Sequence, residues 1–173
     1  MTHAVSSGYR FDDTDLLFRE FHENHTEMNR SKIAVARINA IHDPYSKKIS
    51  NADMLYTICL FITEPPAWID RYEWRRCTDI EKQGILGHFV LLGERLGVKG
   101  VHDWKTWDDA VAFQRAYEAK HYVYHESNNA VAVPTIDLFI SNVPKSLRWA
   151  ARWAAYSLMD PFLLKTMGLP QVS

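Results

Sequence analysis

Two short polar segments constrain the fold of this 173-residue chain more than any other feature of its sequence. Thr78-Asp79-Ile80-Glu81 is a full capping box, and Ser50-Asn51-Ala52-Asp53 has the same pattern with aspartate in place of glutamate. In such a box the first and fourth residues each bond the other's backbone N–H group, which favours the start of an α-helix. The sequence therefore predicts that helices begin after Ser50 and after Thr78.

Prolines and glycines predict the ends of other helices. Proline lacks a backbone N–H and disfavours helical geometry in the residue before it, so Asp43-Pro44 and Glu64-Pro65-Pro66 are each expected to end a helix. Gly97 is a suitable terminator for the helix that follows Thr78. Alternation typical of strands occurs only in His121–His125. The prediction is an all-α fold of about seven to nine helices, the first starting at residues 12–14 and the later ones covering residues 106–121, 128–140, 144–158 and 161–168.

Composition excludes several classes of protein. The length fits one domain, and the net charge of −1 does not indicate a nucleic-acid partner. Cys59 and Cys77 form neither a disulfide framework nor a C-x-x-C metal site, so a reducing, intracellular compartment is expected. No apolar run approaches about 20 residues, so no transmembrane helix is expected within this chain, and its polar start does not resemble a signal peptide.

His42 occupies an unusual position on a predicted helix. Val35, Ile38 and His42 are spaced to share one apolar face, and His42 lies in the last turn before Asp43-Pro44. One interpretation is a core histidine bonded to a carbonyl group. The other is an axial ligand to haem iron, because neutral imidazole is a common haem ligand. The spacing alone leaves both open.

Other histidines have simpler interpretations. Glu118-x-x-His121 is typical of di-iron carboxylate sites only when it occurs twice with two further glutamates, and here it occurs once. A non-haem iron oxidase is therefore a third alternative that rests on this one pair. His22 and His25 lie in a polar stretch and are expected to be solvated.

Two aromatic segments each allow two interpretations. RYEWRR, residues 71–76, is either a patch that binds anionic groups or, as the favoured interpretation, a solvated turn with Trp74 buried. In the last long helix Trp149, Trp153 and Tyr156 share a face. That face either packs in the core, which we favour, or lies on a membrane surface.

Several longer segments carry a resemblance to a known family. They are GYRFDDTDLLFREF, RINAIHDPYSKKISNADMLYT, WIDRYEWR, TDIEK, YEAKHYVYHESNNAVAVPTIDLFI and NVPKSLRWAARWAAYSLMDPFLLKTMG. Together they resemble the fungal ER-bound oxygenases of the mycophenolic acid pathway type, which share a catalytic domain with the bacterial latex-clearing (rubber) oxygenases. The resemblance extends from about Tyr9 to Gly168 and is most specific around Arg37-x-Asn39-x-x-His42.

The resemblance implies an all-helical protein that binds haem b, with His42 as the proximal iron ligand. It also implies that Arg10, Asp13 and Thr14 match the distal stretch, where rubber oxygenases carry arginine, lysine and threonine. Asp13 therefore stands in the lysine position, and an aspartate cannot hold a ligand on the iron in the same way.

If haem is bound, its propionates are expected to pair with Arg37 or with the arginines of RYEWRR, among them Arg75. Residues 1–173 are expected to form a single domain around a haem-sized cavity. This domain corresponds to the C-terminal larger part of the oxygenase catalytic domain and lacks the usual N-terminal anchor and first helices.

The expected function is that of a haem b-dependent, iron-containing oxygenase. It would use dioxygen to cleave or oxygenate an apolar substrate with a C=C bond, such as an isoprenoid or polyketide. The alternative is a non-catalytic helical module that binds a hydrophobic ligand or a partner subunit. The protein is expected to be cytoplasmic or associated with the ER membrane. Four apolar residues of the first helix need cover, which predicts peripheral membrane contact or self-association: Leu16, Leu17, Phe18 and Phe21.

Overall fold

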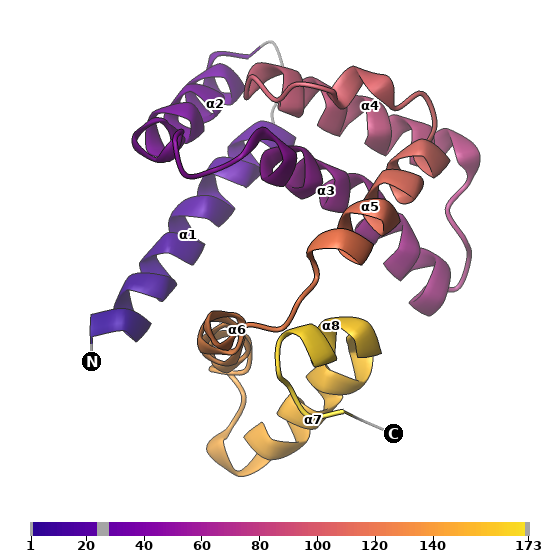
Figure 1. The fold of residues 1–173 in the computed structure, drawn as a ribbon. Helices are drawn as coiled ribbons and strands as arrows, with labels where there is room; N and C mark the ends of the chain where they lie inside the picture. Colours follow the sequence, from indigo (N-terminus) through magenta and orange to yellow (C-terminus); the bar gives the residue numbers. More distant parts are fainter. Residues whose placement is uncertain (1, 24–27, 172–173) are drawn as a thin grey trace. The chain divides into compact units, whose positions relative to one another are not determined.

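The computed structural model describes residues 2–23 and 28–171, with side chains from residue 12 onward. Within this part of the chain every regular element is a helix, which confirms the all-α prediction (Figure 1). The eight α-helices also agree with the predicted number. They are α1 Thr2–His22, α2 Asn29–His42, α3 Asn51–Tyr72, α4 Asp79–Arg95, α5 Trp107–His121, α6 Glu126–Phe139, α7 Arg148–Leu158 and α8 Pro161–Thr166, with short 3-10 helices at Asp43–Tyr45, Val101–Asp103 and Lys145–Leu147.

Both predicted capping boxes are present. The Ser50 hydroxyl accepts from the Asp53 backbone N–H at 3.1 Å, and the Asp53 carboxylate accepts from the Ser50 N–H at 3.3 Å. At the start of α4, the Thr78 hydroxyl accepts from the Glu81 N–H at 3.3 Å, and the Glu81 carboxylate accepts in return at 2.8 Å. The sequence therefore located the first turns of α3 and α4 correctly.

Helix α3 does not end at Glu64-Pro65-Pro66, so this predicted break is wrong. Pro65 and Pro66 both lie inside the helix, which continues to Tyr72. Pro66 has no N–H to donate to the carbonyl of Ile62, four residues earlier. The indole Nε1–H of Trp107, on α5, donates to that carbonyl at 3.2 Å instead. A tertiary contact thus supplies the bond that the proline removes.

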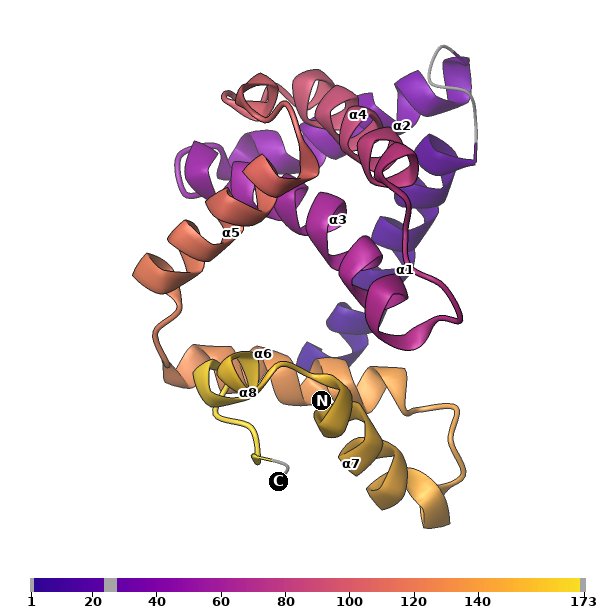
Figure 2. The same cartoon turned by 90° about the vertical axis from the view of Figure 1, so that its right-hand side faces the viewer.

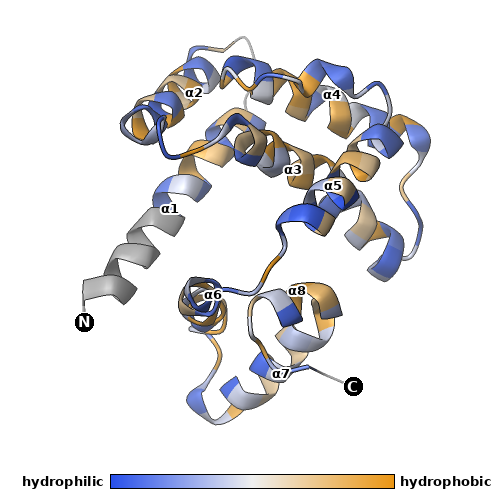
Figure 3. Ribbon diagram, in the orientation of Figure 1, coloured by the Kyte–Doolittle hydropathy of each residue, from blue (hydrophilic) through white to orange (hydrophobic). Residues whose placement is uncertain are grey.

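The chain consists of two compact units, described here separately. Unit 1 comprises residues 1–15 and 122–173, and unit 2 comprises Leu16–His121. In unit 2, α3 packs against both α4 and α5 (Figure 1 and Figure 2). Hydrophobic residues cover much of α3 (Figure 3). The buried core residues of unit 2 are Phe21, Val35, Ile58, Cys59, Ile62, Leu86, Leu92, Val98, Val101, Trp104 and Ala110.

Unit 1 has a smaller core, built from α6, α7 and α8. Its buried cluster consists of Ile136, Tyr156, Leu164 and Leu169. Tyr156 is buried as the core interpretation predicted, but Trp149 is 68% exposed and Trp153 is 49% exposed. Core packing is therefore the wrong interpretation for these two tryptophans.

Two further expectations about apolar residues need correction. Trp74 is 87% exposed rather than buried in its turn. Helix α1 begins at Thr2, ahead of the predicted start at residues 12–14, and its end is better covered than expected, since Phe21 is 1% exposed. Only Leu16, at 58%, remains a strongly exposed member of the apolar set on α1. Among the described helices, none combines the length and apolar character needed to cross a bilayer.

Candidate functional site

His42 is the last residue of α2 and lies on its inward face. Ser31, Ala34 and Val35 are buried on this helix, and Ile38 and His42 are half-buried at the matching spacing of three to four residues. The chain then turns into the short 3-10 helix Asp43–Tyr45, with Pro44 near its start. The predicted apolar face and the predicted helix end are therefore both present.

The His42 side chain lines a pocket of about 520 Å³ in unit 2. The pocket lies among the end of α2, the start of α3, and the end of α4 with its following loop. Its volume is within the usual range of small-molecule sites, about 300–1,000 Å³. Its walls combine apolar and polar groups; they are Asn39, His42, Asp43, Ser46, Ile49, Asn51, Met54, Glu94, Arg95, Leu96, Gly97 and Val98.

One nitrogen of His42 is buried without a partner. Nδ1 has no hydrogen bond to any residue that the structure describes. Leaving a buried polar group unsatisfied costs about 1–3 kcal/mol, so native proteins rarely do so without a reason. The carbonyl bond expected of an ordinary core histidine is not found at this nitrogen. Because Nδ1 is buried, a metal at His42 would be bound through Nε2, and Nδ1 lacks the hydrogen bond that the second nitrogen of a metal-ligating histidine usually donates.

Two asparagines tie the pocket walls together. Asn39 donates to the carbonyl of Arg95 at 3.1 Å. Asn51 donates to the carbonyl of Lys99 at 3.0 Å, and its side-chain oxygen accepts from the Lys99 N–H at 2.8 Å. Both asparagines lie in sequence patterns described above, but those patterns predicted no role for them. No pattern indicated Arg95. No local pattern could have found Arg95, because it reaches the pocket only through the packing of α4.

The two predicted propionate partners lie away from this pocket. Arg37 is exposed on α2, and neither Arg37 nor Arg75 is among the pocket-lining residues. Arg75 instead makes a bidentate pair with Glu81, at 2.7 and 2.8 Å, and lies over the ring of Trp74. The Arg75 guanidinium is the main reason why the pKa of the Glu81 carboxyl is far below its usual range.

The residues predicted for the distal side lie in unit 1. The side chain of Arg10 is outside the described side chains, while Asp13 and Thr14 are exposed on α1. Since His42 belongs to unit 2, the two predicted halves of the site fall in different units. The structure does not bring them together within one unit.

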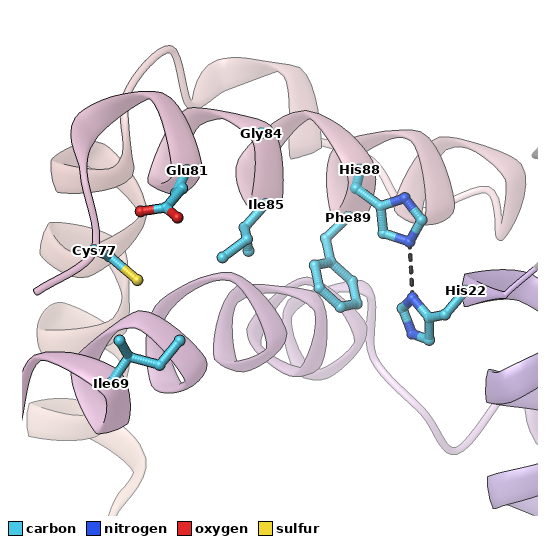
Figure 4. A pocket seen from close by; sticks show the side chains of 8 residues that line it. All are labelled: His22, Ile69, Cys77, Glu81, Gly84, Ile85, His88 and Phe89. Carbon is cyan, nitrogen blue, oxygen red and sulfur yellow. Dashed lines mark hydrogen bonds between the residues drawn. The ribbon is translucent and has the colours of Figure 1, made fainter. Parts of the chain in front are cut away.

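A second pocket, of about 480 Å³, contains a histidine pair that sequence reasoning missed (Figure 4). His22 is exposed as predicted, but its Nδ1 is hydrogen-bonded to His88 Nε2 at 2.8 Å; His25 lies outside the described residues. Burial lowers the pKa of both imidazoles, and the pKa of His22 is lowered further by His88. Cys77 and Glu81 lie toward the other end of the pocket, away from the two rings (Figure 4).

The two side chains of the possible di-iron motif, Glu118 and His121, interact with other residues. Glu118 accepts hydrogen bonds from Tyr56 at 2.8 Å and from Gln114 at 2.9 Å, and His121 stacks on Tyr117. Among the described residues, no group of three or more His, Cys, Asp or Glu side chains is arranged to hold a metal ion. The di-iron alternative therefore gains no support.

Comparison with known proteins identifies the family. Residues 18–173 match the model of the family described as ER-bound oxygenase mpaB/B'/rubber oxygenase, catalytic domain. The chain is 33% identical over 170 residues to ER-bound oxygenase mpaB' of Penicillium brevicompactum, covering 91% of this chain and 40% of that protein. It is 34% identical over 167 residues to ER-bound oxygenase mpaB of the same organism, covering 90% and 41%.

A third relative extends the comparison to another species. ER-bound oxygenase mpaB of Penicillium roqueforti is 31% identical over 170 residues, covering 91% of this chain and 57% of that protein. No solved structure is a significant match. The chain thus spans between 40% and 57% of the length of these relatives. Because the family model matches most of the chain, the protein belongs to the ER-bound oxygenase mpaB/rubber oxygenase catalytic-domain family.

Proposed function

We propose that this protein is a haem b-dependent oxygenase in which His42 binds the iron. The observation that carries the proposal is the half-buried His42 imidazole at the end of α2, which lines a pocket of ligand size. Family membership supports the oxygenase activity, and the position of His42 in the segment of closest resemblance supports its role. Bound haem would supply the iron at which dioxygen is activated.

The residues around His42 fit a planar, largely apolar group with acidic substituents. Ile49, Met54, Leu96 and Val98 provide apolar wall, and Arg95 adds a cation to the same pocket. The protein's part in the reaction is to hold the group through His42, orient it against these walls and limit access of water. The hydrogen bonds of Asn39 and Asn51 keep the ends of α2, α3 and α4 in register around it.

The distal assignment follows from the family resemblance, and the propionate assignment follows from the positive charge of the arginines. Arg75 would have to leave Glu81 to bind a propionate, so Arg37 is the better of the two predicted partners. Arg10 and Thr14 are proposed to hydrogen-bond oxygen on the distal side. Asp13 replaces the lysine of rubber oxygenases, so the resting-state ligand that a lysine can hold is not expected here.

The proposed substrate is an apolar molecule with a C=C bond, of isoprenoid or polyketide type. Such a molecule partitions into lipid, and the relatives are named as ER-bound. The proposal therefore includes work at the surface of the ER membrane.

A second candidate is a non-catalytic module that binds a hydrophobic ligand or partner subunit. The observation that favours it is Asp13, which removes the distal lysine of the rubber oxygenases. Haem binding without dioxygen consumption in the presence of isoprenoid substrates would support this candidate.

The absorption spectrum of the haem-loaded protein tests the role of His42. We expect a stoichiometric Soret band for the wild type and its loss in His42→Ala. His102→Ala is the matched control, because His102 is an exposed histidine of the same unit, 3.9 Å from Glu94. Circular dichroism would establish that both variants keep their helical content. A full Soret band with unchanged ligand-field features in His42→Ala would show that another group binds the iron.

A further inference from the structure

Helix α7 presents an uncharged face to solvent. Trp149 and Trp153 are four residues apart, so their side chains lie on the same side of the helix, and they are 68% and 49% exposed. The other exposed residues of this helix are small or apolar: Ala154, Ser157 and Leu158. Leu147, directly before the helix, is 55% exposed. An exposed face of this kind marks an interaction surface.

The charged residues of α7 each directly precede a tryptophan, so they lie about 100° further round the helix, on the neighbouring side. Arg148 donates to the carbonyl groups of Val143 and Ser141, at 3.0 and 2.6 Å. Arg152 pairs with Asp137 of α6. Both arginines are half-buried, and Tyr156 beside them is buried in the core of unit 1. These contacts fix the rotation of α7 and keep its tryptophans directed outward.

The segment that contains α7 has basic residues but no acidic ones. From Ser141 to Leu158 the sequence contains Lys145, Arg148 and Arg152 but no aspartate or glutamate. A short helix that exposes tryptophans on an uncharged face and has basic residues beside that face is typical of helices that lie in a membrane interface. Arg148 and Arg152 are held by protein partners, so the exposed Lys145 is the basic residue of this segment that can attract lipid phosphates.

The two tryptophans have the chemical character that suits a membrane interface. Neither indole N–H donates a hydrogen bond to any residue that the structure describes. An indole ring with an apolar body and a free polar edge suits the boundary between acyl chains and head groups, where tryptophan is enriched. With eleven residues, α7 is about 16 Å long, which is enough to lie on a bilayer but not to cross it.

We infer that the exposed face of α7, centred on Trp149 and Trp153, is a membrane-docking surface whose partner is the interfacial region of a phospholipid bilayer. This inference rests on the proposed work at the ER membrane and assigns the contact to a defined surface of unit 1. The docked helix lies parallel to the membrane plane, with both indoles at head-group depth. The contact adds affinity for the surface on which an apolar substrate dissolves.

Vesicle flotation with the full chain tests this inference. We expect the wild type to float with phosphatidylcholine vesicles, and more strongly when they also contain phosphatidylserine. The double variant W149A/W153A should lose about tenfold or more in vesicle affinity, since two aromatic side chains no longer leave water. Trp74→Ala is the matched control, because Trp74 is 87% exposed but lies in unit 2; its affinity should stay at the wild-type value.

A second readout places the helix in the bilayer. Lipids brominated near the head groups should quench tryptophan fluorescence of the wild type and of Trp74→Ala, and the quenching should be lost in W149F/W153F. The inference is wrong if the wild type does not float, or if Trp74→Ala weakens binding as much as W149A/W153A does. It is also wrong if light scattering shows that Trp149 and Trp153 instead hold two copies of the chain together. Haem binding is measured separately by the Soret band, so failure of His42 as a ligand would leave this result unaffected.

Discussion

The two cysteines of unit 2 differ sharply in their surroundings. Cys59 is fully buried, and its thiol donates to the carbonyl of Ala110 at 3.1 Å. Burial raises its pKa to about 12, so almost no reactive thiolate forms at neutral pH. Cys77 is half-buried and borders the pocket of the histidine pair. Its pKa is also raised, mainly by burial.

We therefore expect a thiol reagent at neutral pH to modify one cysteine in the folded protein. Cys77 should react slowly and Cys59 only after unfolding, because reaction needs both access and the thiolate. Mass spectrometry of the labelled peptides measures this order. Cys77→Ser is the control and should give an unlabelled native protein. Labelling of Cys59 at the rate of Cys77 would show that the core around Ile62 opens readily.

The His22–His88 pair makes stability depend on pH. In their hydrogen bond one ring nitrogen donates and the other accepts, so protonation of both rings removes the acceptor. The pKa of each is lowered below 6.5, the ordinary value expected in the unfolded chain. A lowered pKa means that the unfolded state binds protons first as the pH falls. The stabilising contribution is therefore complete above about pH 6.5 and is lost as the pH falls through the folded pKa values.

Urea unfolding between pH 5 and 8 checks this expectation. The wild type should lose stability below about pH 6.5. The double variant H22Q/H88Q should show a flatter pH dependence over the same interval, whatever its absolute stability. His102→Gln, which replaces an exposed histidine outside the pair, is the control. Equal slopes in all three proteins would mean that the pair contributes no proton linkage.

At the scale of elements, two glycines of α4 allow a direct comparison. A Cβ atom built on Gly93 would lie 2.7 Å from Cγ1 of Val101, which is buried. A Cβ atom on Gly87 would meet nothing within 4 Å. Alanine at position 93 should therefore destabilise the protein by about 1–3 kcal/mol through overpacking. Alanine at position 87 should stabilise it by about 0.5–1 kcal/mol through helix propensity.

Thermal unfolding of Gly93→Ala and Gly87→Ala measures the predicted loss of stability at one position of α4 and the predicted gain at the other. If both variants are stabilised, Val101 and the 3-10 helix that carries it move away at little energetic cost. If Gly93→Ala is destabilised and Gly87→Ala is stabilised, α4 and residue 101 are in close contact.

Local signals predicted the elements better than they predicted contacts. Ser50 and Thr78 bond residues only three positions away, so their helix starts could be read from the sequence. The continuation of α3 through Pro65 and Pro66 depends on Trp107, which is 45 residues from Ile62. The same limit applies to the site. Periodicity placed His42 on the inward face, but Arg95 and the His22–His88 pair come together only through helix packing.

At the scale of the whole molecule, each unit depends on its own buried cluster. Ile62 in unit 2 is fully buried, and Leu164 in unit 1 is 2% exposed. Truncation to alanine leaves a cavity, so each change should cost about 2–5 kcal/mol. Ile33→Ala is a matched control at a 67% exposed site and should change stability by less than about 0.5 kcal/mol.

Unfolding followed by tryptophan fluorescence and by circular dichroism measures these losses. Leu164→Ala should have the larger relative effect on its unit, since the buried cluster there is smaller. A Leu164→Ala protein as stable as the wild type would show that residues outside this cluster hold α6, α7 and α8 together.

The prolines inside α3 also separate two parts of the helix that should differ in their rates of hydrogen exchange. Pro65 and Pro66 carry no exchangeable amide hydrogen, so two rungs of the hydrogen-bond ladder are absent at one place. Residues 67–72 follow this gap, and Trp68 and Tyr72 among them are each 46% exposed. In deuterium exchange these last amides should open as a separate cooperative segment, faster than those around Cys59. Ile69 belongs to that segment and lines the pocket of the His22–His88 pair at the end near Cys77 (Figure 4). Opening of these six residues would then widen the Cys77 end of that pocket while the core around Cys59 remains closed.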